Sequence, residues 1–332
     1  MKEETIRPQS LFDRYLQLAR EDIVTFFHNA PFRNIPCPAC GSEMAIFQFR
    51  KMGFDYEECP ECGTLFVNPR PGEEAFSAYY QRSPSVDFWA TNFYKVTEDA
   101  RRREIIRPKA ELVSGLLRKY CEYVDLPNAT LIDIGAGYGV FCEEAKKAFP
   151  DGIAVLGIEP ASALSAICQD KGIRTIPKFL HEVTDRDLEG ISVIAATSFE
   201  LVEHLHDPGQ FIRDCKKILR PGSLLILTTL NWHGFDLQIL REKSKSIHPP
   251  HHINFFTPSS LSQLLTENGF SICEVSTPGK LDVDIAAKQP EDIKDPFIRR
   301  IVGSDEAARQ MFQEFLREAH MSSHMMIVAR SV

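Results

Sequence analysis

Residues 131–139 read LIDIGAGYG, and this stretch decides the fold. Its apolar first half predicts a buried strand, its glycines predict a tight turn, and Val140–Phe149 has a helical pattern. Glycines at such a turn let the backbone approach a ligand at the helix N-terminus. Twenty residues after Gly139, the predicted strand Ala154–Ile158 is followed by Glu159, where a carboxylate can accept from both ribose hydroxyls. This order of elements predicts a nucleotide pocket in an α/β sheet.

The spacing of the glycines distinguishes two kinds of cofactor. Gly135, Gly137 and Gly139 follow the pattern Gly-x-Gly-x-Gly instead of Gly-x-Gly-x-x-Gly. Asp133 lies two residues before the first of them. A carboxylate repels a pyrophosphate but attracts the cationic sulfonium and amino group of S-adenosylmethionine (SAM). The pattern resembles the first motif of class I methyltransferases, so we expect a SAM site, with a nicotinamide-dependent enzyme as the alternative.

The resemblance extends beyond the glycine turn. Residues 194–208 read IAATSFELVEHLHDP, which is similar to the E-x-x-E-H-x-x-D-P stretch of the ubiquinone-type O-methyltransferases. Two further matches, LRPGSL and HINFFT, follow in the expected order, so the resemblance covers about residues 130–277. It implies that Phe179 and Phe199 join the cofactor site. Where the family often has an aspartate for the adenine amino group, this chain reads FLHE from Phe179.

Short apolar runs alternate with helical patterns to the end of the chain, which is typical of βαβ units. With the resemblance, they predict an α/β, Rossmann-like fold: a mostly parallel seven-stranded sheet with helices on both faces and an antiparallel last strand. The clearest strands lie at Leu131–Ile134, Ala154–Ile158, Ser192–Thr197, Leu224–Thr229, Ser271–Ser276 and His324–Ala329.

Two cysteine motifs, CPACG and CPECG, precede this domain and contain Cys37, Cys40, Cys59 and Cys62. A Cys-x-x-Cys turn points both thiolates at one tetrahedral ion, and the following glycine permits the tight backbone. Four thiolates leave no open position, so we expect a structural zinc ribbon that folds a segment too small for its own core. The alternative is four free buried cysteines. A ribbon in this place resembles a subgroup of bacterial sugar and secondary-metabolite methyltransferases that includes deoxysugar C-methyltransferases.

Composition and charge exclude several classes of protein. The net charge is −8 over 332 residues and the isoelectric point is about 5.7, which oppose a large nucleic-acid footprint. No apolar run is long enough to span a bilayer, and the start has no signal-peptide core. Nine cysteines without a secretory signal indicate reduced thiols in the cytoplasm.

Four segments are predicted along the chain. They are an N-terminal helix at 1–35, the zinc ribbon at 36–70, a helical linker at 71–128 and the methyltransferase domain at 129–332. Inserts in the last segment are expected at 231–256 and 279–322. Such inserts commonly roof a pocket or mediate contacts in a homodimer.

Glu200, Glu203, His204 and His252 are the candidate catalytic residues, since they follow strands that end at the carboxyl edge of the sheet. In one interpretation His204 or a histidine of the cluster His248–His252, with Glu203 nearby, is a general base for an acceptor hydroxyl. In another, all four bind a divalent ion that holds neighbouring hydroxyls, which resembles small-RNA 2′-O-methyltransferases. In a third, Glu203 and His204 cap a helix and only shape the pocket. The sequence leaves these three open.

The expected activity is methyl transfer from SAM to a small hydroxylated acceptor, such as a sugar, a sugar nucleotide or a secondary-metabolite intermediate. Transfer from a sulfonium is a direct displacement, so the protein needs mainly to align the acceptor and allow loss of a proton. O-methylation is preferred because no carbanion-stabilising set is visible. The alternatives are a deoxysugar C-methyltransferase, an RNA-modifying methyltransferase that uses the ribbon, and a non-catalytic protein that retains the fold.

Overall fold

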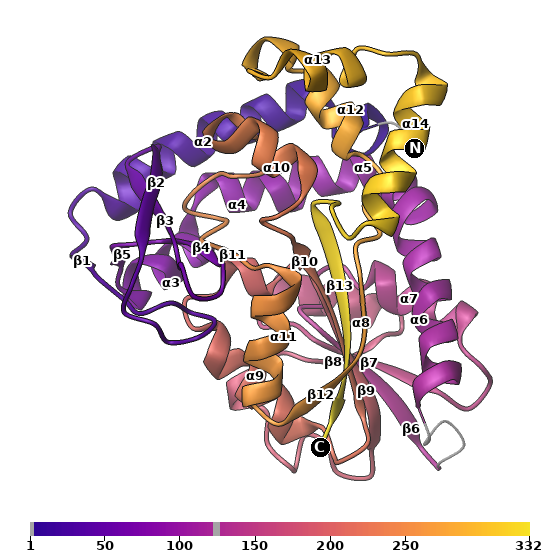
Figure 1. Ribbon diagram of the computed structural model, residues 1–332. Helices are drawn as coiled ribbons and strands as arrows, with labels where there is room; N and C mark the ends of the chain where they lie inside the picture. The colour runs from indigo at the N-terminus through magenta and orange to yellow at the C-terminus, as the bar shows by residue number, and fades with distance from the viewer. Residues whose placement is uncertain (1–2, 122–126) are drawn as a thin grey trace.

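A seven-stranded sheet forms the centre of the molecule in the computed structural model, which describes residues 3–121 and 127–332 (Figure 1). The strand order is β12-β13-β10-β9-β6-β7-β8, and only β13 runs antiparallel to its neighbours. Their bounds are β6 Ala129–Ile134, β7 Ala154–Ile158, β8 Arg174–Ile176, β9 Ser192–Phe199, β10 Leu224–Leu230, β12 Phe270–Ser276 and β13 His324–Ser331. This confirms the predicted mostly parallel sheet with an antiparallel last strand, and it adds the short edge strand β8, which no clear sequence pattern marks.

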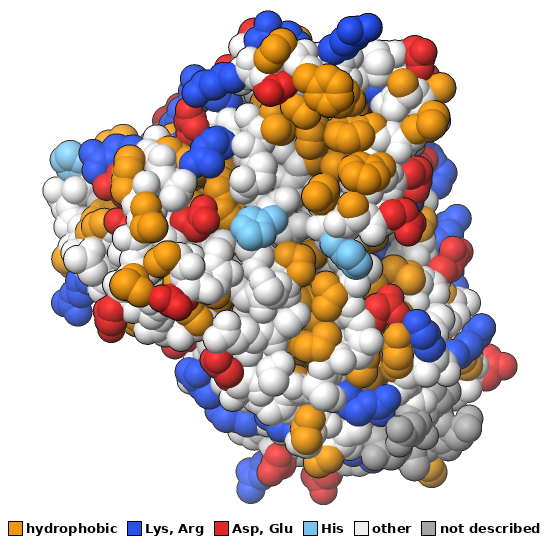
Figure 2. All heavy atoms as spheres, viewed as in Figure 1, with side chains coloured by type: hydrophobic (Ala, Val, Ile, Leu, Met, Phe, Trp, Pro, Cys, Tyr) orange, Lys and Arg blue, Asp and Glu red, His pale blue; other side chains and the backbone are white. Residues whose placement is uncertain are grey.

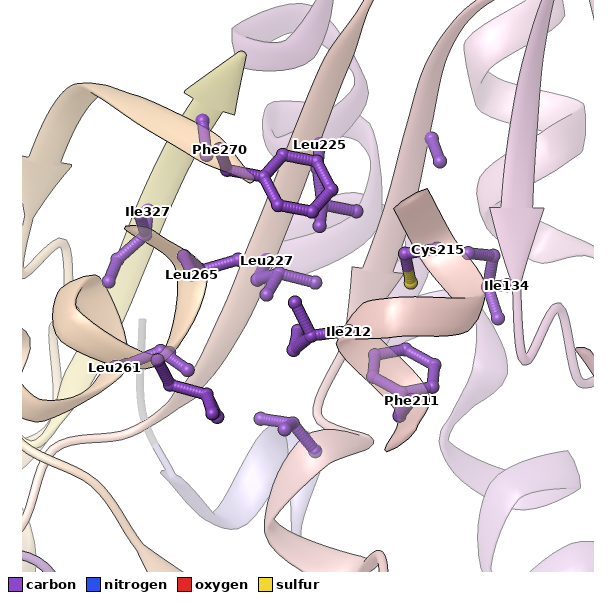
Figure 3. Packing of buried hydrophobic residues seen from close by; sticks show 14 of the residues in the cluster. Ile134, Phe211, Ile212, Cys215, Leu225, Leu227, Leu261, Leu265, Phe270 and Ile327 are labelled. Atoms are coloured by element: carbon purple, nitrogen blue, oxygen red, sulfur yellow. The ribbon is translucent and has the colours of Figure 1, made fainter. Parts of the chain in front are cut away.

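Helices cover both faces of the sheet, and alternate residues of each strand face one of two cores. On one face α9 (Pro208–Ile218) and α11 (Pro258–Glu267) bring Ile212 and Leu261 against Leu225 and Leu227 (Figure 3). On the other face α6 (Arg107–Tyr120), α7 (Val140–Ala148) and α8 (Ser162–Asp170) pack against the intervening side chains such as Ile226. Truncating one of these buried leucines or isoleucines to alanine costs about 2–5 kcal/mol.

The N-terminal part forms a second, smaller sheet flanked by helices. Residues 1–35, predicted as one helix, contain α1 (Glu3–Ile6), α2 (Gln9–Phe27) and the short strand β1 (Phe32–Arg33), because Pro8 separates the two helices. Strands β2 (Ile46–Lys51), β3 (Phe54–Glu58) and β4 (Leu65–Val67) form the antiparallel ribbon, and β5 (Arg70–Pro71) pairs with β1.

A strand from the catalytic domain completes the ribbon sheet. Strand β11 (Asn254–Phe255) pairs with β4, which gives the order β11-β4-β3-β2. A shared core of large side chains fills the junction, among them Tyr56, Val67, Trp232, Ile253 and Phe255. The predicted ribbon at 36–70 and the predicted insert at 231–256 are therefore one structural unit.

The linker after the ribbon is helical, as predicted, and its residues 122–126 lie outside the described residues. Its elements are α3 (Glu73–Arg82), α4 (Pro84–Phe88), a π-helical turn η1 (Trp89–Tyr94), α5 (Lys95–Arg101), a second π-helical turn η2 (Arg102–Ile106) and α6. Because α6 packs directly on the central sheet, it belongs to the catalytic domain and not to a separate linker.

The insert predicted at 279–322 and the helical turns of residues 235–243 together form a helical layer at the top of the molecule as drawn in Figure 1. This layer consists of α10 (Phe235–Leu240), η5 (Arg241–Lys243), α12 (Asp282–Ala287), η6 (Pro290–Asp292), α13 (Pro296–Val302) and α14 (Glu306–Glu318) around one small core. Figure 2 shows apolar side chains gathered over this layer, where Phe297, Met311 and Phe315 are exposed. In the described part of the chain, no helix is long and apolar enough to cross a membrane.

Candidate active site

The glycine-rich loop connects β6 to α7 at the carboxyl edge of the sheet. Gly135, Gly137 and Gly139 have φ angles of +79°, +53° and +69°, a backbone region that residues with a Cβ atom rarely adopt. A Cβ at Gly139 would lie 2.5 Å from the side chain of Ile173, so packing alone requires glycine there. Around Gly137, in contrast, no heavy atom lies within 4 Å of a built Cβ, and this open space leaves the backbone accessible to a ligand.

Two buried carboxylates flank this loop. Glu159 accepts hydrogen bonds from the amides of Gly137 (2.8 Å) and Ala161 (2.9 Å), and burial raises the pKa of its carboxyl. Asp133 accepts a hydrogen bond from the hydroxyl of Thr197 (2.9 Å), and burial raises its pKa to about 6. Each oxygen of Glu159 retains a lone pair for a ribose hydroxyl, so the loop and this acid fit the nucleoside part of SAM.

The two phenylalanines expected at the cofactor site lie in different surroundings. Phe199 ends β9 and contacts Phe141 edge-on, with ring centroids 4.7 Å apart. Phe179 is half exposed, and its amide donates to the carboxylate of Glu182 at 2.8 Å. The carboxylate that follows β8, that of Glu182, is thus bonded within its own turn.

Aromatic residues of the helical linker lie over the glycine-rich loop. Tyr94 of η1 stacks on Tyr138 with ring centroids 4.9 Å apart, and the Tyr138 hydroxyl donates to the carbonyl of Ala90. The linker therefore lies directly beside the expected cofactor and is more than a spacer between two domains.

Three of the four predicted acceptor-side residues converge. Glu203, His204 and His252 each offer a ligand atom, and these atoms lie within 4.8 Å of one another. Glu203 is buried in the turn η4 (Val202–His204), and its carboxylate accepts from the hydroxyl of Thr229 at 2.7 Å. Burial and the charge of Glu200 raise the pKa of Glu203 to about 8.

Backbone carbonyls fix the orientation of the two histidines. Nδ1 of His204 lies 2.9 Å from the carbonyl oxygen of His251, and Nδ1 of His252 lies 2.6 Å from that of Ser246. Since a carbonyl can only accept, both Nδ1 atoms carry the proton and both Nε2 atoms keep a free lone pair. Burial lowers the pKa of both rings, that of His252 to about 3, so both are neutral at pH 7.

Glu200 lies apart from this group although it is only three residues from Glu203. It has a left-handed φ of +51°, and its carboxylate accepts from the hydroxyl of Thr228 at 2.7 Å. Lys109 and His324 lie 3.8 Å from its oxygens. Burial opposes ionisation, but these neighbours lower the pKa of Glu200 to about 2.

Sequence reasoning missed Lys109, whereas it placed the histidines of residues 248–252 around the acceptor. Lys109 comes from α6 with its ammonium 4.3 Å from the ring centroid of Phe199, and burial lowers its pKa. His248 forms a hydrogen bond with the hydroxyl of Tyr15 (3.0 Å), and His251 forms one with the hydroxyl of Tyr79 (3.3 Å). Nothing in the local pattern around Lys109 marks it as a site residue, whereas the run of histidines near His252 is a visible signal.

The four predicted zinc ligands also converge, in the ribbon. The sulfurs of Cys37 and Cys62 lie 3.5 Å apart, and those of Cys40 and Cys59 lie 3.6 Å apart. Tetrahedral zinc with Zn–S bonds of about 2.3 Å places its sulfurs about 3.8 Å apart, so the four thiols fit this ion. The hydrogen bond between Cys37 and Cys62 lowers the pKa of Cys62 to about 5 and raises the pKa of Cys37, so without an ion the two thiols share one proton.

Comparisons with known proteins agree with this geometry. The family model described as "Methyltransferase domain" matches residues 100–275. The ubiquinone biosynthesis O-methyltransferase of Bradyrhizobium sp. (strain ORS 278) is 31% identical over 163 residues, which cover 46% of this chain and 62% of that protein. The enzyme of the same name from Nitrobacter winogradskyi is 32% identical over 46% of this chain and 60% of its own length. The chain thus matches about three fifths of these relatives.

Among solved structures, the plantazolicin methyltransferase BpumL in complex with SAH aligns with a TM-score of 0.48 and 15% identity, over 77% of this chain and 94% of that one. The ribbon lies outside the family match, which begins at residue 100 within the linker. The match covers more than half of the chain, including the glycine-rich loop and the E-x-x-E-H stretch. The chain therefore belongs to the methyltransferase domain family, and its fold is that of the SAM-dependent class I enzymes.

Proposed function

We propose that this protein transfers the methyl group of SAM to an oxygen of a small hydroxylated acceptor, and that Glu203, His204 and His252 hold a divalent cation beside that oxygen. The observation that carries this proposal is the convergence of one carboxylate and two imidazoles within 4.8 Å. Metal-binding histidines characteristically donate their other N–H to a carbonyl or carboxylate, as both histidines do here.

The residues of the glycine-rich loop account for SAM binding. The open backbone at Gly137 receives the nucleoside, Glu159 accepts from the ribose hydroxyls, and Asp133 attracts the positive charge of the cofactor. When bound, SAM supplies a methyl group on a cationic sulfur. The protein's own task is then to align the acceptor oxygen with that methyl group and to exclude water.

The donor set suits a hard or borderline divalent cation such as magnesium, manganese or iron(II). When bound, such a cation would act as a Lewis acid that favours loss of the acceptor's proton. The general-base alternative has less support, because burial lowers the pKa of His252 to about 3 and a base that weak accepts a proton poorly at pH 7.

The acceptor class rests on chemistry and on similarity. The relatives named ubiquinone biosynthesis O-methyltransferase support oxygen as the methylated atom, and the net charge of −8 opposes an RNA substrate. The nine cysteines are thiols and not disulfides, which favours a reducing cytoplasm. The exposed apolar side chains over α13 and α14 support the expected homodimer, which size-exclusion chromatography would test.

Manganese binding to the full chain, with its ribbon zinc retained, tests the metal proposal. Calorimetry should find one Mn²⁺ site in the wild type, and Glu203→Gln or His252→Gln should weaken it at least about tenfold. His181→Gln, which changes an exposed histidine outside the group, is the matched control and should leave the affinity unchanged.

Turnover completes the test. S-adenosylhomocysteine (SAH) forms from SAM when an acceptor is methylated, and we expect it to form with a member of a panel of sugars and catechols. Its formation should stop on addition of EDTA and return with Mn²⁺, while the SAM affinity measured by calorimetry stays the same. Turnover that resists EDTA, or a wild type that binds SAM but no Mn²⁺, would overturn the metal proposal and favour the general-base mechanism.

A further inference from the structure

The ribbon sheet holds the segment that carries His252. Phe66 and Leu65 of β4 pair with Asn254 and Phe255, and the amide of Val67 donates to the carbonyl of Ile253 at 2.9 Å. The hydroxyl of Tyr56 donates to the carbonyl of His252 itself at 2.8 Å. The backbone on the C-terminal side of this histidine is therefore part of the ribbon.

Arg70, from the end of the ribbon, binds both segments that form the acceptor-side site. Its side chain is 1% exposed. Its guanidinium donates to the carbonyl of Val67 (3.2 Å), the carbonyl of His206 (3.1 Å) and the side-chain oxygen of Asn254 (2.8 Å). His206 lies two residues after His204, just as Asn254 lies two residues after His252. One buried guanidinium thus joins the two segments that carry these histidines.

The same guanidinium is a buried charge without a carboxylate partner. Within residues 3–121 and 127–332, it forms no ion pair with Asp or Glu. Burial lowers the pKa of Arg70 to about 9, whereas Tyr56, Asp207 and Cys37 favour its charged form. Its three oxygen acceptors are therefore the contacts that compensate its burial.

We propose that Arg70 is a positioning residue: its planar fork joins the ribbon to the acceptor-side site and holds the segments of His204 and His252 in register. This inference rests on the proposed zinc ribbon and acceptor site. It explains why a small metal-binding unit precedes this domain, since the ribbon forms a wall of the site.

Two variants separate the charge from the fork. Arg70→Lys keeps the charge but cannot bridge the carbonyl of His206 and the side chain of Asn254 together. Asn254→Ala removes one acceptor of the fork and leaves the ribbon charge unchanged. Arg50→Met is the matched control, because Arg50 is exposed in the same ribbon and bonds only to Asp55.

Two measurements on the full chain, without acceptor or SAM, test this function. Zinc affinity, from competition with a chelator, should change less than about threefold in Arg70→Lys and Asn254→Ala, because neither variant alters a zinc ligand. Amide hydrogen exchange at 201–206 and 248–254 should accelerate at least tenfold in Arg70→Lys and Asn254→Ala, with α9 unchanged. Arg50→Met should match the wild type in both.

Zinc lost from Arg70→Lys would mean that the ribbon itself unfolds, and it would overturn the positioning function. Exchange that rises equally across the whole chain in Arg70→Lys would mean that the residue only stabilises the fold, and it would overturn the positioning function. Neither measurement depends on a cation at Glu203, His204 and His252. A failure of the manganese experiment would therefore leave this result interpretable on its own.

Discussion

Replacing Asp133 by asparagine should make the free protein more stable and SAM binding weaker. The carboxylate is 3% exposed, and burial raises its pKa from 3.8 to about 6. Because the folded-state pKa lies above the unfolded value, ionisation opposes folding. The penalty is absent below pH 3.8, grows between pH 3.8 and 6, and is constant above. Raising the pKa of Asp133 from 3.8 to about 6 lowers the free energy of unfolding by roughly 3 kcal/mol at pH 8 and by about 1.6 kcal/mol at pH 5.

Asparagine is neutral and nearly isosteric, and its oxygen can still accept from Thr197. We therefore expect Asp133→Asn to raise the free energy of unfolding by up to about 3 kcal/mol at pH 8 and by about half as much at pH 5. Affinity for SAM should fall about 10–100-fold, because the carboxylate opposite the cationic cofactor is gone. Urea unfolding at both pH values and calorimetry with SAM measure the two effects, with the exposed Asp151→Asn as control.

Asp133→Asn must show both effects, the higher stability and the weaker SAM binding. A variant less stable than the wild type at pH 8 would show that the carboxylate is stabilised by contacts stronger than its burial penalty. Unchanged SAM affinity would show that Asp133 does not face the cofactor's positive charge, and the assignment of the loop would lose its electrostatic argument.

Three further variants test the remaining assignments. Glu159→Ala should weaken SAM binding by about 1–3 kcal/mol in calorimetry, through lost hydrogen bonds to the ribose, and equal affinity would contradict its role. Cys59→Ser should lose zinc in elemental analysis and unfold at lower urea concentration; a zinc-free wild type with a folded ribbon would end the metal assignment. Lys109→Met should raise the ratio of SAM to SAH affinity about fivefold, because a cation near the sulfonium is removed, and an unchanged ratio would place Lys109 away from the sulfur.

The sequence predicts those parts of the fold that depend on local residue patterns. The glycine spacing of residues 131–139, the cysteine pairs of the ribbon and six of the seven strands all depend on residues close together in the chain. Strand β8 was not marked, because its three residues at the sheet edge include only one buried side chain. The single helix predicted over 1–35 fails at Pro8, whose missing N–H interrupts the helical pattern.

Contacts between distant segments lie beyond such patterns. The pairing of β11 with β4 joins residues almost two hundred positions apart, and only two backbone pairs define it. Lys109 and His324 meet at Glu200 from opposite ends of the catalytic domain. No spacing rule relates these positions, because tertiary packing alone brings them together.

The two carboxylates of the E-x-x-E-H motif lie in different surroundings. Glu200 bonds to Thr228 and Glu203 bonds to Thr229, and consecutive residues of a strand point to opposite faces of its sheet. The left-handed φ of Glu200 turns the chain at the end of β9, so the two carboxylates lie on opposite sides of β10.

These opposite sides give the two acids different ionisation. Glu200, facing Lys109 and His324, has a pKa lowered to about 2 and is a permanent anion. Glu203, buried beside two neutral imidazoles, has a pKa raised to about 8 and is ionised at pH 7 only when a cation compensates its charge. Divalent-ion binding should therefore release a proton near neutral pH in the wild type, and this release should disappear in Glu203→Gln but only become smaller in Glu200→Gln, where burial still raises the pKa of Glu203. Calorimetry of Mn²⁺ binding in buffers of different ionisation enthalpy measures the proton count, and equal release from both variants would place the titrating group elsewhere.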